Sequence, residues 1–209
     1  MTVTSSYRLP ERRNIFLEKY NTAYFFIPKV ASTSIKALCT RLLGLQVEKH
    51  FHKVNFPSLP RSELLANPDI FKFAFVRNPF DRLVSCYASK VRNCRDFARN
   101  EKWHNLSFDQ FVQRVCEIPN EQMDVHFRPQ YTFITDDKGT LVVDFLGRID
   151  RFDDDMKTIF SKTGFPDSLR VDHRGRSIRE HYQKYYTKKS RKLVAERFAE
   201  DLQLFEYSY

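Results

Sequence analysis

The stretch Asn21–Cys39, NTAYFFIPKVASTSIKALC, constrains the fold of this chain more than any other. Its apolar run Tyr24–Ile27 is short and continuous, which is typical of a strand buried on both faces. Pro28 then ends the strand, since proline cannot donate to a ladder. Beyond it, apolar residues recur with the spacing of one helix face, and Gly44 suits the helix end. These residues are Ile35, Leu38, Cys39 and Leu42.

Hydroxyl side chains crowd the start of this predicted helix, at Ser32, Thr33 and Ser34, and Lys29 adds a positive charge nearby. A helix start presents unpaired backbone N–H groups and the positive end of the helix dipole, so it favours an anion such as phosphate. The alternative is that Ser32 merely caps the helix and Lys29 is a solvated surface residue. No glycine occurs between Met1 and Leu43, which excludes a standard ATP or GTP loop.

A second strand-to-helix stretch runs through FKFAFVRNPFDRLVSCYASK. Phe71–Val76 is predicted to be a buried strand, Asn78 is a good N-cap, and Pro79 suits the first helical position. Arg77 follows the strand directly, at the end where open α/β sheets place their ligands. The helix that follows has an apolar stripe of Phe80, Leu83, Val84 and Tyr87.

The charge of the chain favours an anionic partner. Its 209 residues include 35 Lys and Arg against 26 Asp and Glu, which gives a formal charge of +9 and a pI near 9.4. This balance is compatible with nucleic acid, a membrane surface, an acidic glycan or a polyanionic cofactor, and does not choose among them. The length and the 42% hydrophobic content predict one domain over residues 1–209 with one sizeable core.

The cysteines and the apolar runs bear on the compartment. Four cysteines form no C-x-x-C pair, and Cys39, Cys86 and Cys116 lie on the apolar stripes of predicted helices, so we expect free thiols in a reducing compartment. The N-terminal stretch has no signal-peptide core, and no run reaches the ~20 apolar residues of a membrane span. We therefore expect a soluble, cytoplasmic protein of bacterial origin, with a soluble catalytic domain of a membrane-anchored enzyme as the alternative.

The two strand-to-helix stretches together resemble a known family. IPKVASTSIK resembles the 5′-phosphosulfate loop of sulfotransferases that use 3′-phosphoadenosine-5′-phosphosulfate (PAPS), in the carbohydrate branch (sulfotransferase family 2) that includes heparan sulfate 2-O and chondroitin enzymes. The second stretch resembles the family's 3′-phosphate motif, with Arg77 and Ser85 at the matching positions. Ala31 stands where many relatives have glycine. The resemblance implies a three-layer fold like the P-loop nucleotide kinases, with a central, mainly parallel sheet flanked by helices.

The resemblance also implies the cofactor residues. The loop would supply Lys29 and the residues after Val30, and the second motif would supply Arg77 and Ser85. A basic segment, residues 170–190, is a possible lid over the cofactor and holds Arg174 as a further candidate. The full set of expected cofactor residues is Lys29, Ala31, Ser32, Thr33, Ser34, Arg77, Ser85, Arg176 and Ser177.

The implied reaction is metal-free, in-line transfer of the sulfuryl group of PAPS to a hydroxyl of a carbohydrate or a glycosylated small molecule, leaving 3′-phosphoadenosine-5′-phosphate. Lys29 would stabilise the leaving phosphate. A histidine is the natural base for the acceptor hydroxyl, because its pKa of ~6.5 lets it accept a proton near neutrality. The candidates are His126, in the HFRPQ segment that resembles the family's acceptor region, and His52 or its neighbour His50 between the two motifs.

The rest of the chain is expected to be scaffold. Residues 1–20 form a loosely packed extension before the first strand, and residues 45–68 a loop over the site. Ser107 and Gln110 make a capping box for the next helix, whose apolar stripe is Phe108, Phe111, Val112 and Val115. The stretch from Leu141 is predicted to be a third buried strand, followed by a helix whose first turn holds Asp153, Asp154 and Asp155. Carboxylates in a first turn interact favourably with the helix dipole, and we prefer this interpretation to a metal site. One amphipathic helix on Val194, Phe198 and Leu202 ends the chain.

Two other functions remain open from the sequence. A non-catalytic basic module that binds nucleic acid or another polyanion would explain the charge equally well, although the chain has no recognisable nucleic-acid signature. A kinase-like nucleotide enzyme is weakened by the missing Walker glycines. The acceptor and the oligomeric state are not specified by these motifs.

Overall fold

The computed structural model describes residues 13–47, 51, 54–91, 103, 105–169, 171–172 and 179–209. Its contacts divide the chain into two compact units. The sheet unit comprises Met1–Val76 and Thr132–Gly175, and the helical unit comprises Arg77–Tyr131 and Arg176–Tyr209. The chain therefore leaves the first unit directly after a strand and later returns to it.

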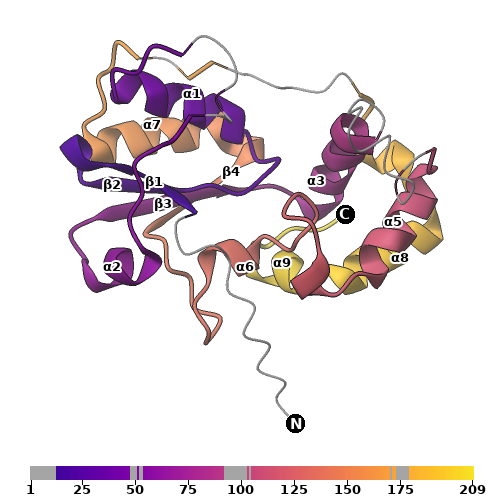
Figure 1. Cartoon of the computed structure of the whole chain (residues 1–209). Helices are drawn as coiled ribbons and strands as arrows, with labels where there is room; N and C mark the ends of the chain where they lie inside the picture. The colour runs from indigo at the N-terminus through magenta and orange to yellow at the C-terminus, as the bar shows by residue number, and fades with distance from the viewer. Residues whose placement is uncertain are drawn as a thin grey trace. The chain divides into compact units, whose positions relative to one another are not determined.

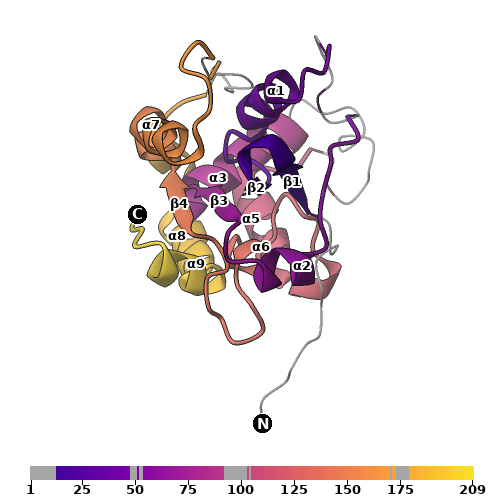
Figure 2. The ribbon, with the colours of Figure 1, turned by 90° about the vertical axis from the view of Figure 1, so that its left-hand side faces the viewer.

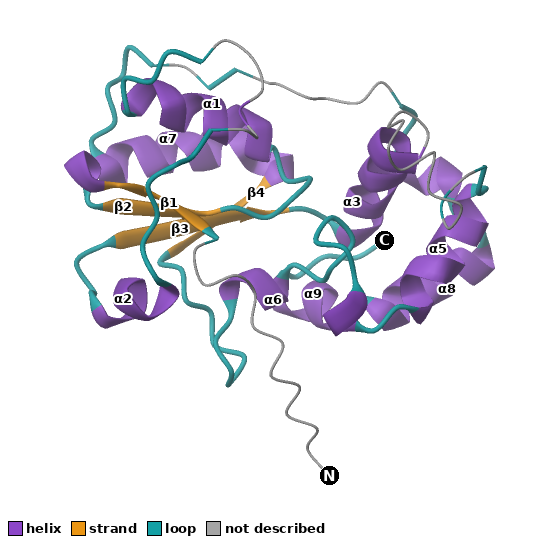
Figure 3. Cartoon of the chain, viewed as in Figure 1, coloured by secondary structure: helices purple, strands orange, loops and turns teal. Residues whose placement is uncertain are grey.

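Four strands form the sheet of the first unit, in the order β1-β2-β3-β4 (Figures 1 and 3). They are β1 Asn14–Leu17, β2 Thr22–Phe25, β3 Phe71–Val76 and β4 Phe145–Arg148. β1 pairs antiparallel with β2, whereas β2–β3 and β3–β4 are parallel. The sheet is thus mainly parallel, so the carboxyl ends of β2, β3 and β4 lie at one edge.

The two central strands confirm the predictions from their apolar runs. All four residues of β2 are buried, and so are five of the six residues of β3, as expected for strands covered on both faces. Tyr24 and Phe73, directly paired across the ladder, stack with ring centroids 5.1 Å apart. β2 ends at Phe25, two residues before the predicted end at Ile27.

The edge strands differ from the predictions. The expectation of a loosely packed N-terminal extension is wrong for Asn14–Leu17, which is strand β1, with Ile15 and Leu17 buried. Asn14 anchors this strand, because its side-chain Nδ2 donates to the Leu59 carbonyl at 2.7 Å. In β4 only Gly147 is buried, so the prediction of a third fully buried strand is also wrong. β4 has a neighbour on one side only, which leaves its side chains partly exposed.

Helices cover both faces of the sheet. α1 (Ser32–Leu42) and α7 (Phe152–Thr163) lie over one face, and the short α2 (Arg61–Ala66) lies over the other (Figures 1 and 2). α2 falls inside the stretch 45–68 that was predicted to be a loop. Short 3₁₀ turns, η1 (Glu18–Tyr20) and η5 (Ile149–Arg151), connect strands to the next element. The predicted α/β class with a mainly parallel sheet flanked by helices is confirmed.

The helical unit is built around one apolar cluster. Its helices are α3 (Pro79–Cys86), the π-helical turn η3 (Tyr87–Val91), α5 (Phe108–Glu117), α8 (Lys188–Arg197) and α9 (Ala199–Leu204), with 3₁₀ turns η4 (Asn120–Gln122) and η6 (Tyr182–Tyr185). The cluster includes Phe80, Leu83, Phe111, Phe127, Val194 and Phe198. Apart from Phe127, these are stripe residues that periodicity predicted for α3, α5 and the final helix.

Two details of this unit test the predicted helix ends. The capping box of Ser107 and Gln110 is confirmed at the start of α5. The single amphipathic helix predicted at the end of the chain is instead two helices, α8 and α9, which meet at Phe198. The remaining short helix, α6 (Tyr131–Ile134), begins at the last residue of the helical unit's first segment. No helix in the described part of the chain has both the length and the apolarity to cross a membrane.

Candidate functional site

The loop between β2 and α1 has an unusual backbone. Lys29 and Ala31 both adopt positive φ angles, 71° and 56°, in the left-handed region that L-residues with a side chain rarely occupy. Between them Val30 is fully buried, and Pro28 before them is buried as well. The two left-handed residues therefore turn the chain sharply from the end of β2 into the first turn of α1.

This turn shapes the start of α1. The N–H groups of Ser34 and Ile35 donate to the Ala31 carbonyl at 2.9 and 3.2 Å, whereas those of Ser32 and Thr33 have no acceptor within the helix. Ala31 itself is the N-cap and offers no side-chain cap, so the alternative that Ser32 caps the helix is wrong. The helix start therefore combines N–H groups that lack an intrahelical acceptor with the positive end of the dipole, as an anion site requires.

The side chains of this loop differ in burial. Lys29, Ser32 and Thr33 are half-buried, while Ser34 is only 1% exposed. Ser34 is thus enclosed in the protein, and its backbone N–H closes the first turn. The residues that meet solvent at this helix start are Lys29, Ala31, Ser32 and Thr33.

Two further cations near this loop were not singled out from the sequence. The Lys36 Nζ lies 4.1 Å from the centroid of the Phe26 ring, and the Arg13 guanidinium lies 5.1 Å from the same centroid. Burial and the nearby charge of Arg13 lower the pKa of Lys36. The spacing from Ser32 to Lys36, one helical turn, is the signal that could have placed this lysine on the same side of α1. Arg13 had no such signal.

In the helical unit, the backbone of Arg77 is held by one side chain. The Arg77 N–H donates to Gln130 Oε1 at 3.0 Å, and Gln130 Nε2 donates to the Arg77 carbonyl at 2.8 Å. Gln130 is fully buried, and its own N–H donates to Asp201 Oδ2 at 2.8 Å. Burial raises the pKa of Asp201, although backbone hydrogen bonds from Gln130 and Tyr131 act in the opposite direction.

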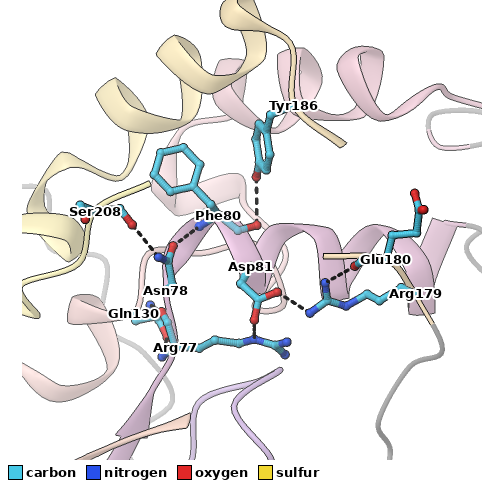
Figure 4. A network of polar contacts seen from close by, with 9 residues as sticks. All are labelled: Arg77, Asn78, Phe80, Asp81, Gln130, Arg179, Glu180, Tyr186 and Ser208. Atoms are coloured by element: carbon cyan, nitrogen blue, oxygen red, sulfur yellow. Dashed lines mark hydrogen bonds and ion pairs between the residues drawn. The ribbon is translucent and has the colours of Figure 1, made fainter. Parts of the chain in front are cut away.

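The side chain of Arg77 belongs to an ion-pair network (Figure 4). Its Nε donates to Asp81 Oδ2 at 2.6 Å, and Nη2 of Arg179 donates to the other carboxylate oxygen, Oδ1. Asp81 lies in the first turn of α3, one turn after Arg77, so the i,i+4 spacing could have revealed this pair. Arg179 lies far from Asp81 along the chain; it belongs to the basic segment 170–190, but no sequence signal singled it out.

Ser85 and His126 are the other two predicted residues of this unit that the structure describes. Ser85 is on α3 and only 6% exposed. Its neighbour Cys86 donates from Sγ to the His126 carbonyl at 2.9 Å, which holds the His126 backbone against α3. The helical unit therefore brings together Arg77, Ser85 and the backbone of His126, whereas Lys29 and residues 31–34 belong to the sheet unit.

His126 has a carboxylate partner that the sequence analysis missed. Its Nδ1 lies 2.6 Å from Asp124 Oδ1, and its backbone N–H donates to the same oxygen at 2.8 Å. Burial alone would raise the pKa of Asp124, but these hydrogen bonds and the charges of His126 and Lys90 together lower it. A histidine with one ring nitrogen held by a carboxylate has a defined orientation, which suits acid–base chemistry at the other nitrogen.

Several predicted residues lie outside the described part of the chain. They are the base candidate His52 with its neighbour His50, and the lid candidates Arg174, Arg176 and Ser177.

Two of the three aspartates of α7 have partners in the sheet unit that hold them in place. Asp154 pairs with Lys157 at 2.8 Å, and Asp155 Oδ2 accepts from the Arg148 N–H at 2.6 Å. Across the residues that the structure describes, no three His, Cys, Asp or Glu side chains are grouped as a metal site would need. Cys39, Cys86 and Cys116 are free thiols, as predicted.

Comparisons with known proteins agree with the motifs. The family model described as "Sulfotransferase family" matches residues 12–208, a range that includes residues of both units. Over 75% of the present chain, the sequence is 24% identical to carbohydrate sulfotransferase 14 of Danio rerio. Over 78% of the present chain, it is 22% identical to carbohydrate sulfotransferase 14 of Homo sapiens. It spans about half the length of these curated relatives. An uncharacterised protein of Archaeoglobus fulgidus is 32% identical over a segment that covers 47% of this chain and 72% of the length of that protein. No solved structure matches the chain.

Proposed function

Because the chain belongs to the sulfotransferase family, we propose that it transfers the sulfuryl group of PAPS to a hydroxyl of a carbohydrate or a glycosylated small molecule. The names of its curated relatives support a carbohydrate acceptor. The observation that carries the proposal is the left-handed turn at Lys29 and Ala31, which opens the start of α1 towards an anion. The same strand–turn–helix unit, on a parallel sheet, supports a fold like the P-loop nucleotide kinases.

The residues fit the two anionic ends of PAPS. The N–H groups of Ser32 and Thr33, their hydroxyls and the Lys29 ammonium suit the 5′-phosphosulfate. The Arg77 guanidinium, a planar fork that can donate two hydrogen bonds to one phosphate, suits the 3′-phosphate together with the Ser85 hydroxyl. When bound, PAPS supplies the activated sulfuryl group.

The residues at the helix start would stabilise charge during transfer. As the bond from sulfur to the phosphate oxygen breaks, negative charge grows on that oxygen. Lys29 and the N–H dipoles at the start of α1 are fixed in position before the reaction, so they lower the barrier without reorganising. By analogy with phosphoryl transfer, positioning and electrostatics then supply most of the catalysis.

We assign the general base to His126. Asp124 holds Nδ1 at 2.6 Å, so that Nε2 is the nitrogen available to take the proton of an acceptor hydroxyl. The carboxylate would also stabilise the imidazolium that forms. His52 is the competing assignment, because it lies between the two cofactor motifs, where heparan sulfate sulfotransferases carry their catalytic histidine.

The cofactor is tested by calorimetric titration with 3′-phosphoadenosine-5′-phosphate (PAP), AMP and ATP, on the parent, on Arg77→Ala and on Arg114→Ala as an exposed control. We expect the parent and the control to prefer PAP, and Arg77→Ala to lose at least tenfold in PAP affinity only, because one charge-assisted hydrogen bond is worth about 1.5–3 kcal/mol. Equal or absent binding of all three nucleotides by the parent would refute the proposal and favour the polyanion-binding module.

The base is tested by comparing His126→Gln and His52→Gln, with the exposed His181→Gln as control. Loss of a general base lowers kcat by roughly 100-fold or more. We expect this loss in His126→Gln alone, with PAP affinity unchanged in all three variants. A loss confined to His52→Gln would move the base to His52.

A further inference from the structure

Asp81 stands between two arginines that come from distant parts of the chain (Figure 4). One carboxylate oxygen accepts from Arg77 Nε and the other accepts from Arg179 Nη2. The three side chains are largely enclosed, with 17% of Arg77, 21% of Asp81 and 11% of Arg179 exposed. Ion pairs at this depth are screened less than surface pairs, so their geometry is held more firmly.

The Asp81 carboxylate holds the Arg77 guanidinium at Nε. A guanidinium carries five N–H donors in a rigid fork, and four of them are on the two Nη groups. Holding the fork at Nε sets the plane in which the Nη groups lie. The rotation of a long, flexible side chain is thereby restricted before any ligand arrives, which reduces the entropy lost on binding.

The network has an excess of positive charge. Arg77 and Arg179 carry two positive charges, and Asp81 neutralises one of them. Burial lowers the pKa of the enclosed Arg82, Cys86 and Asp201 act in the opposite direction, and the charge of Arg77 adds a smaller lowering effect. An anion beside this group would therefore meet a net positive field.

The first turn of α3 is held from the C-terminal part of the chain at three positions. Asn78 Nδ2 donates to the Ser208 carbonyl at 2.7 Å, and the Tyr186 hydroxyl donates to the Phe80 carbonyl at 3.0 Å. Asp81 receives Arg179, as described above. These contacts fix the backbone of the turn, and only the Asp81 contact acts on the Arg77 side chain itself.

From this geometry we infer that Asp81 is a positioning residue: it orients Arg77 and Arg179 as a pair, and thereby sets the preference for nucleotides that carry a 3′-phosphate. This inference rests on the proposed function, because it deepens the role of the Arg77 site. It also gives Arg179 a place at that site, which no motif assigned.

The experiment is calorimetric titration of the full chain with PAP and with AMP, which differ by the 3′-phosphate alone. Asp81→Asn keeps the shape of the side chain and removes its charge. We expect its PAP affinity to fall about tenfold, in the range found when groups that orient a ligand-binding residue are lost. AMP affinity should change less than twofold, since AMP lacks the group that Arg77 binds. A merely structural role would lower both affinities together.

Glu180→Gln is the matched control. It removes the same negative charge from the residue next to Arg179, but the Glu180 carboxylate pairs with Lys184 at 3.0 Å. The Glu180 group that accepts from Arg179 Nη1, at 3.3 Å, is the backbone carbonyl, which the substitution leaves in place. The control should bind PAP as the parent does. If Asp81→Asn instead binds PAP more tightly than the parent, removal of a repelling charge outweighs positioning, and the inference is overturned.

Two more variants guard against misfolding. Arg179→Lys keeps the charge and loses the fork, and should reduce PAP affinity in the same selective way even if Asp81→Asn does not fold. Asp81→Glu keeps the carboxylate and should recover part of the PAP preference. A parent that prefers PAP while Arg179→Lys and Asp81→Asn retain that preference would reject the inference alone. A parent with no PAP preference would reject the proposed function as well.

Discussion

The carboxamide of Gln130 makes both backbone hydrogen bonds of Arg77, accepting from its N–H at 3.0 Å and donating to its carbonyl at 2.8 Å. Arg77 follows the last residue of β3. The Gln130 side chain hydrogen-bonds the Arg77 backbone in the way that a neighbouring strand would. The buried Asp201 in turn accepts from the Gln130 N–H. The residue most closely tied to the proposed 3′-phosphate site is therefore held through a buried polar chain.

Gln130→Glu should destabilise the protein. A carboxylate cannot donate, so the Arg77 carbonyl loses this donor, and the new charge lies where Gln130 Nε2 is now 3.4 Å from Asp201 Oδ2. We expect a loss of about 2–3 kcal/mol in the free energy of unfolding, measured by urea denaturation. Gln203→Glu, at an exposed position of α9, is the control and should change stability by less than about 0.5 kcal/mol. Equal effects of the two variants would contradict the role of Gln130.

Ala31→Gly should not destabilise the protein, and should stabilise it by up to about 1.6 kcal/mol. The φ of 56° costs an alanine about 1–2 kcal/mol, which glycine avoids, while the extra freedom of glycine in the unfolded chain offsets about 0.4–1 kcal/mol. Urea denaturation measures the change. Ala37→Gly, in the interior of α1, is the control and should destabilise by about 1 kcal/mol or more. Similar losses in both variants would argue against the left-handed turn.

Gly147→Ala should destabilise the sheet unit. A Cβ at this position would lie 2.5 Å from Cε1 of Phe75, a fully buried ring that packs on Phe152. Overpacking of this kind costs about 1–3 kcal/mol. The same substitution in a Phe75→Leu background should cost less than half as much, because the ring that it meets is gone. Additive effects in this double-mutant cycle would show that the two residues are not in contact.

Asp124→Asn should alter the dependence of stability on pH. The pKa of Asp124 in the folded protein is below its ordinary value of 3.8, so the carboxylate contributes stability above pH 3.8 that is lost as the pH falls through the lowered folded pKa. The difference in unfolding free energy between parent and variant should therefore shrink from pH 5 to pH 3. Urea denaturation at both values measures it, with the exposed Asp167→Asn as reference. A difference that grows on acidification would contradict this assignment.

The local elements followed from the sequence where the pattern carries its own physical cause. Continuous apolar runs marked β2 and β3, the stripes marked α1, α3 and α5, and Ser107 with Gln110 marked the start of α5. β1 was missed because Asn14–Leu17 is too short to show a period, and its pairing with β2 decides its conformation. The break at Phe198 was missed because the apolar stripe continues across it.

The partners of the candidate residues followed less well. Lys29, Arg77 and Ser85 stood out because they belong to two strand-to-helix motifs that occur in the order typical of the family. Each motif is a short, continuous stretch of sequence, so it can be recognised without the fold. Asp81 and Asp124 lie within four residues of Arg77 and His126, so spacing could have revealed them. Gln130 and Arg179 could not be found in this way, since a hydrogen bond between distant positions leaves no periodic trace.

The sequence by itself therefore determined the strands and helices that bury continuous apolar runs and stripes, and the family to which the chain belongs. These depend on interactions between near neighbours, whose spacing is visible in the chain. Only the tertiary structure decided that Ala31 turns left-handed, that Gln130 holds the Arg77 backbone and that Asp81 joins Arg77 to Arg179. Such contacts form only after the chain has folded, because the packing of distant segments brings their partners within hydrogen-bond distance.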